Sequence, residues 1–168
     1  MAEQKENNPS FRVIYYAFTG RAEPLRLAAA LGGIAFEDEY ISQAQQGKDK
    51  AEGKRRWSGP PELVVYDKDG KVLTNIAQSN TCLRYVGKLA GVYPENPVQR
   101  ALADEIVDSV EDLFGAALPS FFRAKDEEDK KTKCAEVCKE GGILRYWLDK
   151  FLLRIQENEK RGNKNGLF

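Results

Sequence analysis

The side chains that could do chemistry in this 168-residue chain include no histidine. That absence excludes Ser-His-Asp triads, Cys-His pairs and zinc sites built from cysteine and histidine. Catalysis must therefore come from carboxylates, Tyr, Lys, Arg, Ser, Cys or backbone groups. The three cysteines, Cys82, Cys134 and Cys138, are too few and too scattered to indicate a disulfide framework. Cys134 and Cys138 stand one helical turn apart without further ligands, so we expect no metal site.

The composition is typical of a soluble globular protein, with 42% hydrophobic and 31% charged residues. Lys and Arg number 26, as do Asp and Glu, and no basic run is present, so we expect no nucleic-acid partner. No apolar stretch approaches the roughly 18 residues of a membrane span. Residues 1–10 (MAEQKENNPS) lack the apolar core of a signal peptide, so we expect a disordered lead-in to a cytoplasmic protein.

Residues 11–90 alternate between strand and helix patterns. Aromatic and β-branched residues predict strands over 11–16, 36–41, 63–66 and 71–76, the last two joined by a tight turn at 67–70. Helices are predicted over 21–32 and 79–90, with Pro24 in the first turn of one and Ser79 as the N-cap of the other. The polar stretch 42–56 indicates a surface loop with a helical turn. This order is that of a thioredoxin-like domain.

The rest of the chain has helical patterns only. Residues 92–97 (VYPENP) contain two prolines and are predicted to be a linker. Apolar residues then recur every three or four positions from Leu102 to Ala117, which indicates an amphipathic helix that Pro119 ends or kinks. A charged helix follows over 126–140, and a further apolar stripe runs from Leu144 to Ile155. The patterns predict an α/β domain over 11–91 and an all-α domain over 98–168.

Four motifs in sequence order carry a family resemblance. They are residues 15–27 (YYAFTGRAEPLRL), 60–63 (PPEL), 78–94 (QSNTCLRYVGKLAGVYP) and 103–113 (ADEIVDSVEDL). With them the chain resembles the cytosolic glutathione S-transferases over about residues 11–160, closest to the sigma-like, tyrosine-type group. The resemblance implies the glutathione transferase fold, in which a thioredoxin-like, glutathione-binding N-terminal domain precedes an all-α C-terminal domain. The C-terminal domain is expected to be incomplete here.

The resemblance implies that Tyr15 is the catalytic residue. A thiol with a pKa of about 8.5 is mostly protonated at neutral pH, and the thiolate is the nucleophile. A phenolic O–H aimed at the sulfur favours its anionic form by hydrogen bonding. Tyr16, one position later, is expected to face the other side of the strand. The alternative is that Tyr15 is only a strand aromatic.

The same resemblance implies a set of glutathione-binding residues. Arg21 would lie beside the ligand, and Pro61 matches a cis-proline. Pro60, the residue before it, would pair its backbone with the cysteinyl part of glutathione. Gln78 and Ser79 would receive the γ-glutamyl end, because a helix N-terminus offers a positive dipole end to a carboxylate. The alternatives are a surface arginine, an ordinary Pro-Pro loop and a plain N-cap.

Two further residues are predicted from the resemblance. Lys54 is chosen for the glycyl carboxylate of glutathione among the cations and the tryptophan of residues 50–57. Asp104 matches an aspartate that reaches the glutathione amine across a dimer interface in several classes of the family. Each could equally be a surface charge. Gly59 stands where the family usually has glutamine, so one side-chain contact to the ligand is expected to be missing.

The resemblance also implies a segment beyond Phe168, opening on an N-capping box and forming a central helix of the second domain. Without that helix the apolar stripe from Leu144 to Ile155 would lack a partner. We therefore expect a fragment, a truncated gene model, or a chain whose apolar face another protein covers.

Three functions follow as hypotheses. The first is a glutathione transferase that adds the thiolate to electrophilic small molecules or uses it in isomerisation or peroxide reduction, with glutathione as co-substrate and a homodimeric assembly. The second is a non-catalytic structural or assembly module of the same fold. The third is a thioredoxin-like redox protein, which is disfavoured because Thr19 stands where such a protein needs a cysteine.

Overall fold

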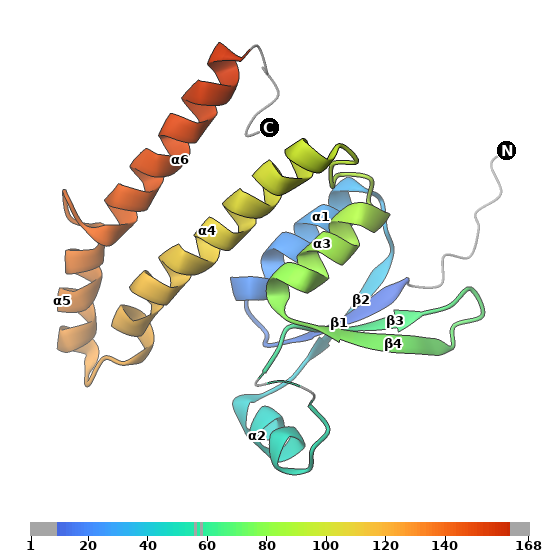
Figure 1. Cartoon of the computed structure of the whole chain (residues 1–168). Coiled ribbons are helices and arrows are strands. Elements are labelled where there is room, and N and C mark those ends of the chain that lie inside the picture. Colours follow the sequence, from blue (N-terminus) through green and yellow to red (C-terminus); the bar gives the residue numbers. More distant parts are fainter. Residues whose placement is uncertain (1–9, 56, 58, 162–168) are drawn as a thin grey trace, which may run out of the picture. The chain divides into compact units, whose positions relative to one another are not determined.

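The computed structural model describes residues 10–55, 57 and 59–161. The predicted lead-in, apart from Ser10, and the last seven positions of the predicted helical domain lie outside these residues. The chain divides into two compact units, Met1–Pro94 and Glu95–Phe168 (Figure 1). Within the described part, no helix combines the length and apolar character needed to cross a membrane.

The first unit is built on a four-stranded sheet with the order β2-β1-β3-β4. Its strands are β1 (Phe11–Tyr15), β2 (Phe36–Tyr40), β3 (Glu62–Tyr66) and β4 (Val72–Ala77). β1 runs parallel to β2 and antiparallel to β3, and β3 and β4 form the predicted hairpin. This mixed sheet confirms the predicted thioredoxin-like arrangement.

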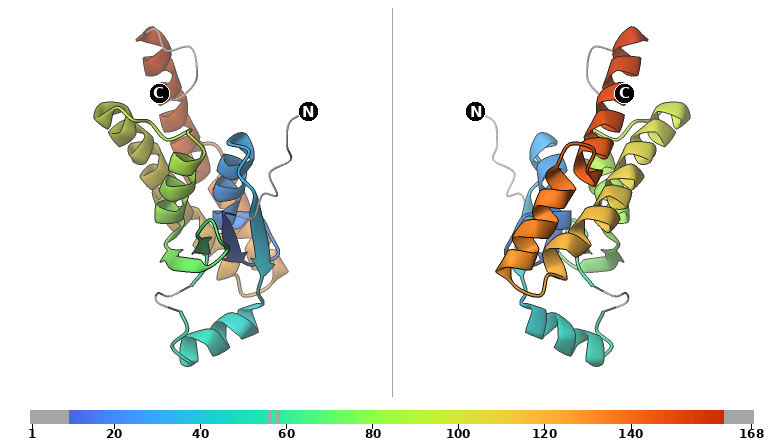
Figure 2. Two further views of the ribbon diagram at one scale, coloured as in Figure 1. Left: turned by 90° about the vertical axis from the view of Figure 1, so that its right-hand side faces the viewer. Right: turned by 90° about the vertical axis from the view of Figure 1, so that its left-hand side faces the viewer.

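The helices of the first unit are η1 (Gly20–Ala22), α1 (Glu23–Leu31), α2 (Gln43–Ala51) and α3 (Ser79–Leu89). α1 and α3 lie side by side on one face of the sheet, whereas α2 lies beyond its end (Figure 1, Figure 2). Pro24 occupies the first turn of α1, as predicted. The prediction of a surface loop with one helical turn over 42–56 is wrong for residues 43–51, which form the regular helix α2. The Ser42 side chain caps this helix by accepting a hydrogen bond from the Gln45 backbone N–H.

The main core lies between the sheet and the pair α1 and α3. Its fully buried side chains include Phe11, Val13, Leu25, Leu63 and Val86. A smaller cluster of Ile14, Ile41 and Val64 forms a second core. Neighbouring residues of a strand point to opposite faces, which is why Val13 and Ile14 belong to different clusters.

Over its described residues, the second unit has three helices, α4 (Pro97–Phe122), α5 (Glu127–Cys138) and α6 (Ile143–Lys160). Pro97, predicted as linker, is the first residue of α4, and the Asn96 side chain accepts hydrogen bonds from the first backbone N–H groups. α4 does not end at Pro119 but continues to Phe122. The Pro119 carbonyl still accepts a bond from the Arg123 N–H, so the last turn closes. α5 lies within the bounds of the predicted charged helix, and α6 contains the predicted apolar stripe but extends beyond its end at Ile155 to Lys160.

Candidate functional site

A polar pocket of about 200 Å³ lies in the first unit. Its walls are Arg21, Gly59, Pro60, Pro61, Gln78 and Ser79. These residues come from η1, from the segment before β3 and from the start of α3. The structure thus brings together five of the seven residues predicted to bind glutathione, from three separate stretches of sequence. What they bind remains a prediction at this point.

The pocket has the character of an anion site. Arg21 is the charged side chain among the residues that line it, and Gln78 and Ser79 at the beginning of α3 add polar groups. The N-terminus of an α-helix carries a partial positive charge that favours carboxylates. Both features select for a negatively charged group.

The start of α3 differs in detail from its prediction. Ser79 is the first residue of the helix rather than its N-cap, which is Gln78. Gln78 has a φ of 75°, in the left-handed region that residues other than glycine seldom adopt. This backbone conformation lets the chain turn sharply from β4 into α3, so that Gln78 and Ser79 both reach the pocket. The peptide bond between Pro60 and Pro61 is cis, as the resemblance implied.

Tyr15 is the last residue of β1 and is only 4% exposed. Its hydroxyl accepts a hydrogen bond from the Arg21 backbone N–H at 3.0 Å. Gly20 passes so close that a Cβ there would lie 2.7 Å from the Tyr15 oxygen. Among the described residues Tyr15 does not itself line the pocket, but one hydrogen bond joins its hydroxyl to Arg21, which does.

Tyr16 has a different partner. Its hydroxyl donates a hydrogen bond to the side-chain oxygen of Gln46 on α2, and its ring stacks on Phe18. Burial, and then the neighbouring Tyr15, raise the pKa of Tyr16 above its ordinary value. The two adjacent tyrosines are therefore hydrogen-bonded to different segments, Tyr15 to η1 and Tyr16 to α2.

Lys54 and Asp104 are the predicted binding residues that the pocket walls do not include. The Lys54 ammonium group is largely exposed and pairs with Glu52 at 2.7 Å, and this hydrogen bond raises its pKa. Asp104 lies half-buried on α4 in the second unit. Its predicted role requires a second subunit and stays a prediction. Arg56, another candidate cation, lies outside the described residues.

Sequence reasoning did not single out Arg55, which joins two acidic side chains, one of them directly after Pro61 in the sequence. Arg55 donates to Asp49 on α2 at 2.7 Å and to Glu62 on β3 at 3.0 Å. All three side chains are at most 10% exposed. Hydrogen bonds from Gln45 and from Arg55 lower the pKa of Asp49. No periodic pattern links positions 49, 55 and 62, so the fold alone brings them together.

Comparison with known proteins gives the functional context. No family model matches the chain. The chain is 32% identical to a hematopoietic prostaglandin D synthase of Gallus gallus over 63% of this chain and 49% of that protein. It is 31% identical to glutathione S-transferase P 1 of Xenopus laevis over 74% of this chain and 58% of that protein. The chain is a homologue of the glutathione S-transferases.

A solved structure supports the homology at the level of the fold. The prostaglandin synthase D of Nilaparvata lugens matches 89% of this chain and 70% of its own, with a TM-score of 0.70 and 28% identity. The fold is therefore that of the glutathione transferases, as predicted. The chain spans about half the length of the curated relatives it matches.

In this transferase homologue, Cys82 is not placed for thiol chemistry. It is fully buried in the main core, and its Sγ donates to the Ile76 carbonyl at 3.4 Å. Burial raises its pKa to about 12. A thiol so protonated is a poor nucleophile, and its place in the core makes Cys82 a packing residue.

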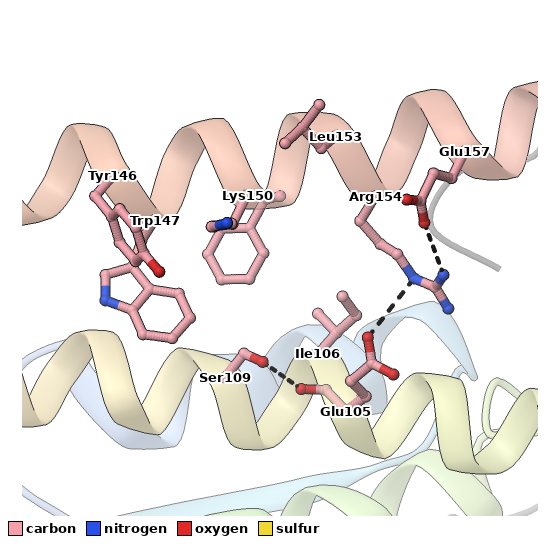
Figure 3. A pocket seen from close by; sticks show the side chains of 10 residues that line it. Glu105, Ile106, Ser109, Tyr146, Trp147, Lys150, Leu153, Arg154 and Glu157 are labelled. Atoms are coloured by element: carbon pink, nitrogen blue, oxygen red, sulfur yellow. Dashed lines mark hydrogen bonds and ion pairs between the residues drawn. The ribbon is translucent and has the colours of Figure 1, made fainter.

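The second unit of the transferase homologue has a groove of its own between α4 and α6, of about 370 Å³ (Figure 3). Trp147 and Phe151 of α6 and Ile106 of α4 line it together with charged side chains. Arg154 lies near both Glu105, at 3.9 Å, and Glu157, at 3.3 Å. The charges in the groove are thus balanced by one another.

Proposed function

We propose that the chain binds glutathione in the polar pocket and holds its thiol as a thiolate for transfer to electrophilic small molecules. One observation carries the proposal. Arg21, Pro60, Pro61, Gln78 and Ser79, each predicted to bind glutathione, line a single pocket. The homology to glutathione S-transferases also supports it. Because the chain matches only part of those relatives, the activity is a proposal.

Each part of the pocket has a defined task in this proposal. Gln78, Ser79 and the positive end of α3 hold the γ-glutamyl carboxylate. The backbone of Pro60 pairs with the peptide part of the ligand in the manner of an added strand. Arg21 adds positive charge from a third side, and charge-assisted hydrogen bonds are stronger than neutral ones.

Tyr15 acts on the sulfur. The Arg21 N–H occupies one acceptor site of the tyrosine oxygen, which fixes its position and orients the O–H. Donation of this O–H to the sulfur stabilises the thiolate, and the thiol proton passes to solvent. The thiolate then attacks the electrophile: a carbon–sulfur bond forms and the leaving group departs with its electron pair.

The test is a comparison of wild type with Tyr15→Phe. We expect wild type to bind immobilised glutathione and to turn over a chlorodinitrobenzene-type electrophile. Tyr15→Phe should retain binding but lose about a hundredfold in kcat, the usual effect of removing one donor that stabilises a developing anion. Its pH–rate profile should shift towards the ordinary thiol pKa of about 8.5.

Tyr40→Phe is the matched control. Tyr40 pairs with Tyr15 in the β1–β2 register and is 59% exposed, away from the pocket walls. This variant should behave as wild type. A folded wild-type protein that neither binds glutathione nor turns over the electrophile would refute the proposal.

A second candidate is a glutathione-binding module without turnover. Two observations favour it: Tyr15 is almost fully buried outside the pocket walls, and Gly59 offers no side chain to the ligand. Under this alternative, wild type binds immobilised glutathione, turnover is absent, and Tyr15→Phe changes nothing.

We further propose that the protein is a cytoplasmic homodimer that needs no metal and binds no nucleic acid. The homodimer rests on the family resemblance, and the other expectations rest on the balanced charge, the lack of histidine and the polar residues 1–10. Light scattering coupled to gel filtration measures the mass of the assembly, and turnover in the presence of a chelator tests the metal. A monomer that conjugates glutathione at full rate would remove Asp104 from the set of binding residues.

A further inference from the structure

Arg55 lies at the centre of a buried ion cluster in the first unit. Its Nη2 and Nη1 atoms bond Asp49 and Glu62, whose side chains are 9% and 7% exposed. The guanidinium is a planar fork with donors on both sides, so one side chain can bridge two carboxylates. Asp49 is held from its other side by the Gln45 amide at 2.7 Å.

The cluster is adjacent to the pocket along the chain. Glu62 is the first residue of β3 and directly follows Pro61, which lines the pocket. Asp49 lies in the last part of α2. The bridge through Arg55 therefore fixes the distance between α2 and the beginning of β3, the two ends of the segment that carries Gly59, Pro60 and Pro61.

α2 approaches the pocket segment at a second point. A Cβ on Gly59 would lie 2.8 Å from the side-chain nitrogen of Gln46, so the Gln46 amide occupies the space beside this pocket residue. The Gln46 oxygen in turn accepts the hydrogen bond from Tyr16 at the end of β1. The position of α2 therefore sets the surroundings of Gly59.

We propose that Arg55 is a positioning residue for the glutathione pocket: by tying Asp49 of α2 to Glu62 of β3, it holds residues 59–61 in place as one wall. This inference rests on the proposed function. Arg55 acts through the wall and not on the ligand, so its loss weakens glutathione binding and leaves the chemical step unchanged. A lysine, with a single point charge, cannot span both carboxylates as the fork does.

The test is Arg55→Lys with Arg26→Lys as a matched control. Arg26 also bridges two carboxylates in the first unit, Asp38 at 2.9 Å and Glu23 at 3.2 Å, and its side chain is 14% exposed. Its bridge joins α1 to β2 and touches no pocket residue. Both variants should lose comparable thermal stability.

Only Arg55→Lys should raise the Kd for glutathione, by about tenfold, because its pocket wall is no longer held in place. Its kcat at saturating glutathione should stay within about twofold of wild type. A triple variant, Arg55→Met with Asp49→Asn and Glu62→Gln, removes the buried charges. It should recover thermal stability while its Kd stays raised, which separates positioning from charge burial.

Hydrogen exchange at the Gly59, Glu62 and Leu63 amides provides a readout that needs no ligand. Exchange there should accelerate in Arg55→Lys and not in Arg26→Lys. Unchanged exchange and Kd in Arg55→Lys, or an equal rise in Kd in Arg26→Lys, would overturn the inference. A wild type that fails to bind glutathione refutes the proposed function, while the exchange data still decide whether Arg55 holds the wall.

Discussion

Two neighbouring tyrosines show how far residue types alone lead. The family resemblance singles out Tyr15, and the structure joins its hydroxyl to the backbone of Arg21. Tyr16 donates instead to Gln46. The proposed division of work between these chemically identical groups follows from their hydrogen-bond partners, since both are substantially buried and their rings lie within 5.3 Å of each other.

The place of a residue was predictable where a sequence motif defines it, but ion-pair partners that only the fold brings together were not. Pro61 and Ser79 stand in motifs that place them near the pocket. Arg55 meets partners six and seven positions away through the fold, and its neighbours in the sequence are equally charged. Lys54, chosen from the same basic stretch, pairs with Glu52 at the surface instead.

The buried Asp49 predicts a pH dependence of stability. Its pKa is lowered by the hydrogen bond from Gln45 and then by Arg55, so the folded state favours the carboxylate. The stabilisation is complete above the unfolded-state pKa of about 3.9 and is lost as the pH falls through the lower folded-state value. Asp49→Asn should therefore lower the free energy of unfolding at pH 7, and the difference from wild type should shrink below about pH 4.

Urea unfolding between pH 7 and pH 2 measures this difference. Asp149→Asn is the control, because Asp149 pairs with Arg145 on the exposed side of α6 and such surface pairs contribute little. A difference in the free energy of unfolding between wild type and Asp49→Asn that stays constant down to pH 2 would contradict the prediction.

At the scale of elements, the strands and the long helices were predictable because period and composition agree. The strands begin and end within about one residue of their predicted bounds. α2 was missed because it is polar on nearly all sides and has no apolar stripe, so only its Ser42 cap distinguishes it from a loop. Pro119 was expected to end or kink α4, but the helix continues to Phe122, and Pro119 lies in its last turns, where few hydrogen bonds depend on it.

Substitution by alanine is expected to have opposite effects on stability at two glycines, Gly32 and Gly47. At Gly32, just after α1, a Cβ would lie 2.4 Å from the Cβ of Ala90, just after α3, and 2.5 Å from its Cα. Gly32→Ala should therefore destabilise the protein by about 1–3 kcal/mol through overpacking. Gly47 lies in the middle of α2 with no atom within 4 Å of its would-be Cβ.

Gly47→Ala should accordingly stabilise the protein by about 0.5–1 kcal/mol, because alanine favours the helix and restricts the unfolded chain. Thermal or chemical unfolding of the two variants measures both effects. A Gly32→Ala variant as stable as wild type or more stable would show that the contact between the ends of α1 and α3 does not limit their packing.

At the scale of the whole molecule, the two units are unequally packed. Both clusters of buried hydrophobic residues found in the described part of the chain belong to the first unit. The buried hydrophobic residues of the second unit are Ala103, Ala117 and Val137. Leu148, Leu152 and Leu153 of α6 remain about half exposed. Sequence patterns locate these helices but do not reveal how much of each apolar stripe is covered.

The smaller buried core of the second unit predicts that its helices open locally more easily than the strands of the first unit. Amides of α5 and α6 should exchange with solvent at least about tenfold faster than those of β1 and β3, because opening them exposes less apolar surface. Native-state hydrogen exchange read by mass spectrometry measures both sets in one sample. Equal protection of the two units would contradict the prediction.

All residues of the polar pocket lie between Arg21 and Ser79, within the first unit. Under the proposed function, the walls of the glutathione pocket are therefore encoded apart from α4, α5 and α6, and only the predicted role of Asp104 would link them to the helical unit. Substitutions elsewhere in the helical unit would then change what the proposed thiolate acts upon without altering the pocket walls. The same separation makes Met1–Pro94 the segment in which an engineer would first test for binding of the tripeptide.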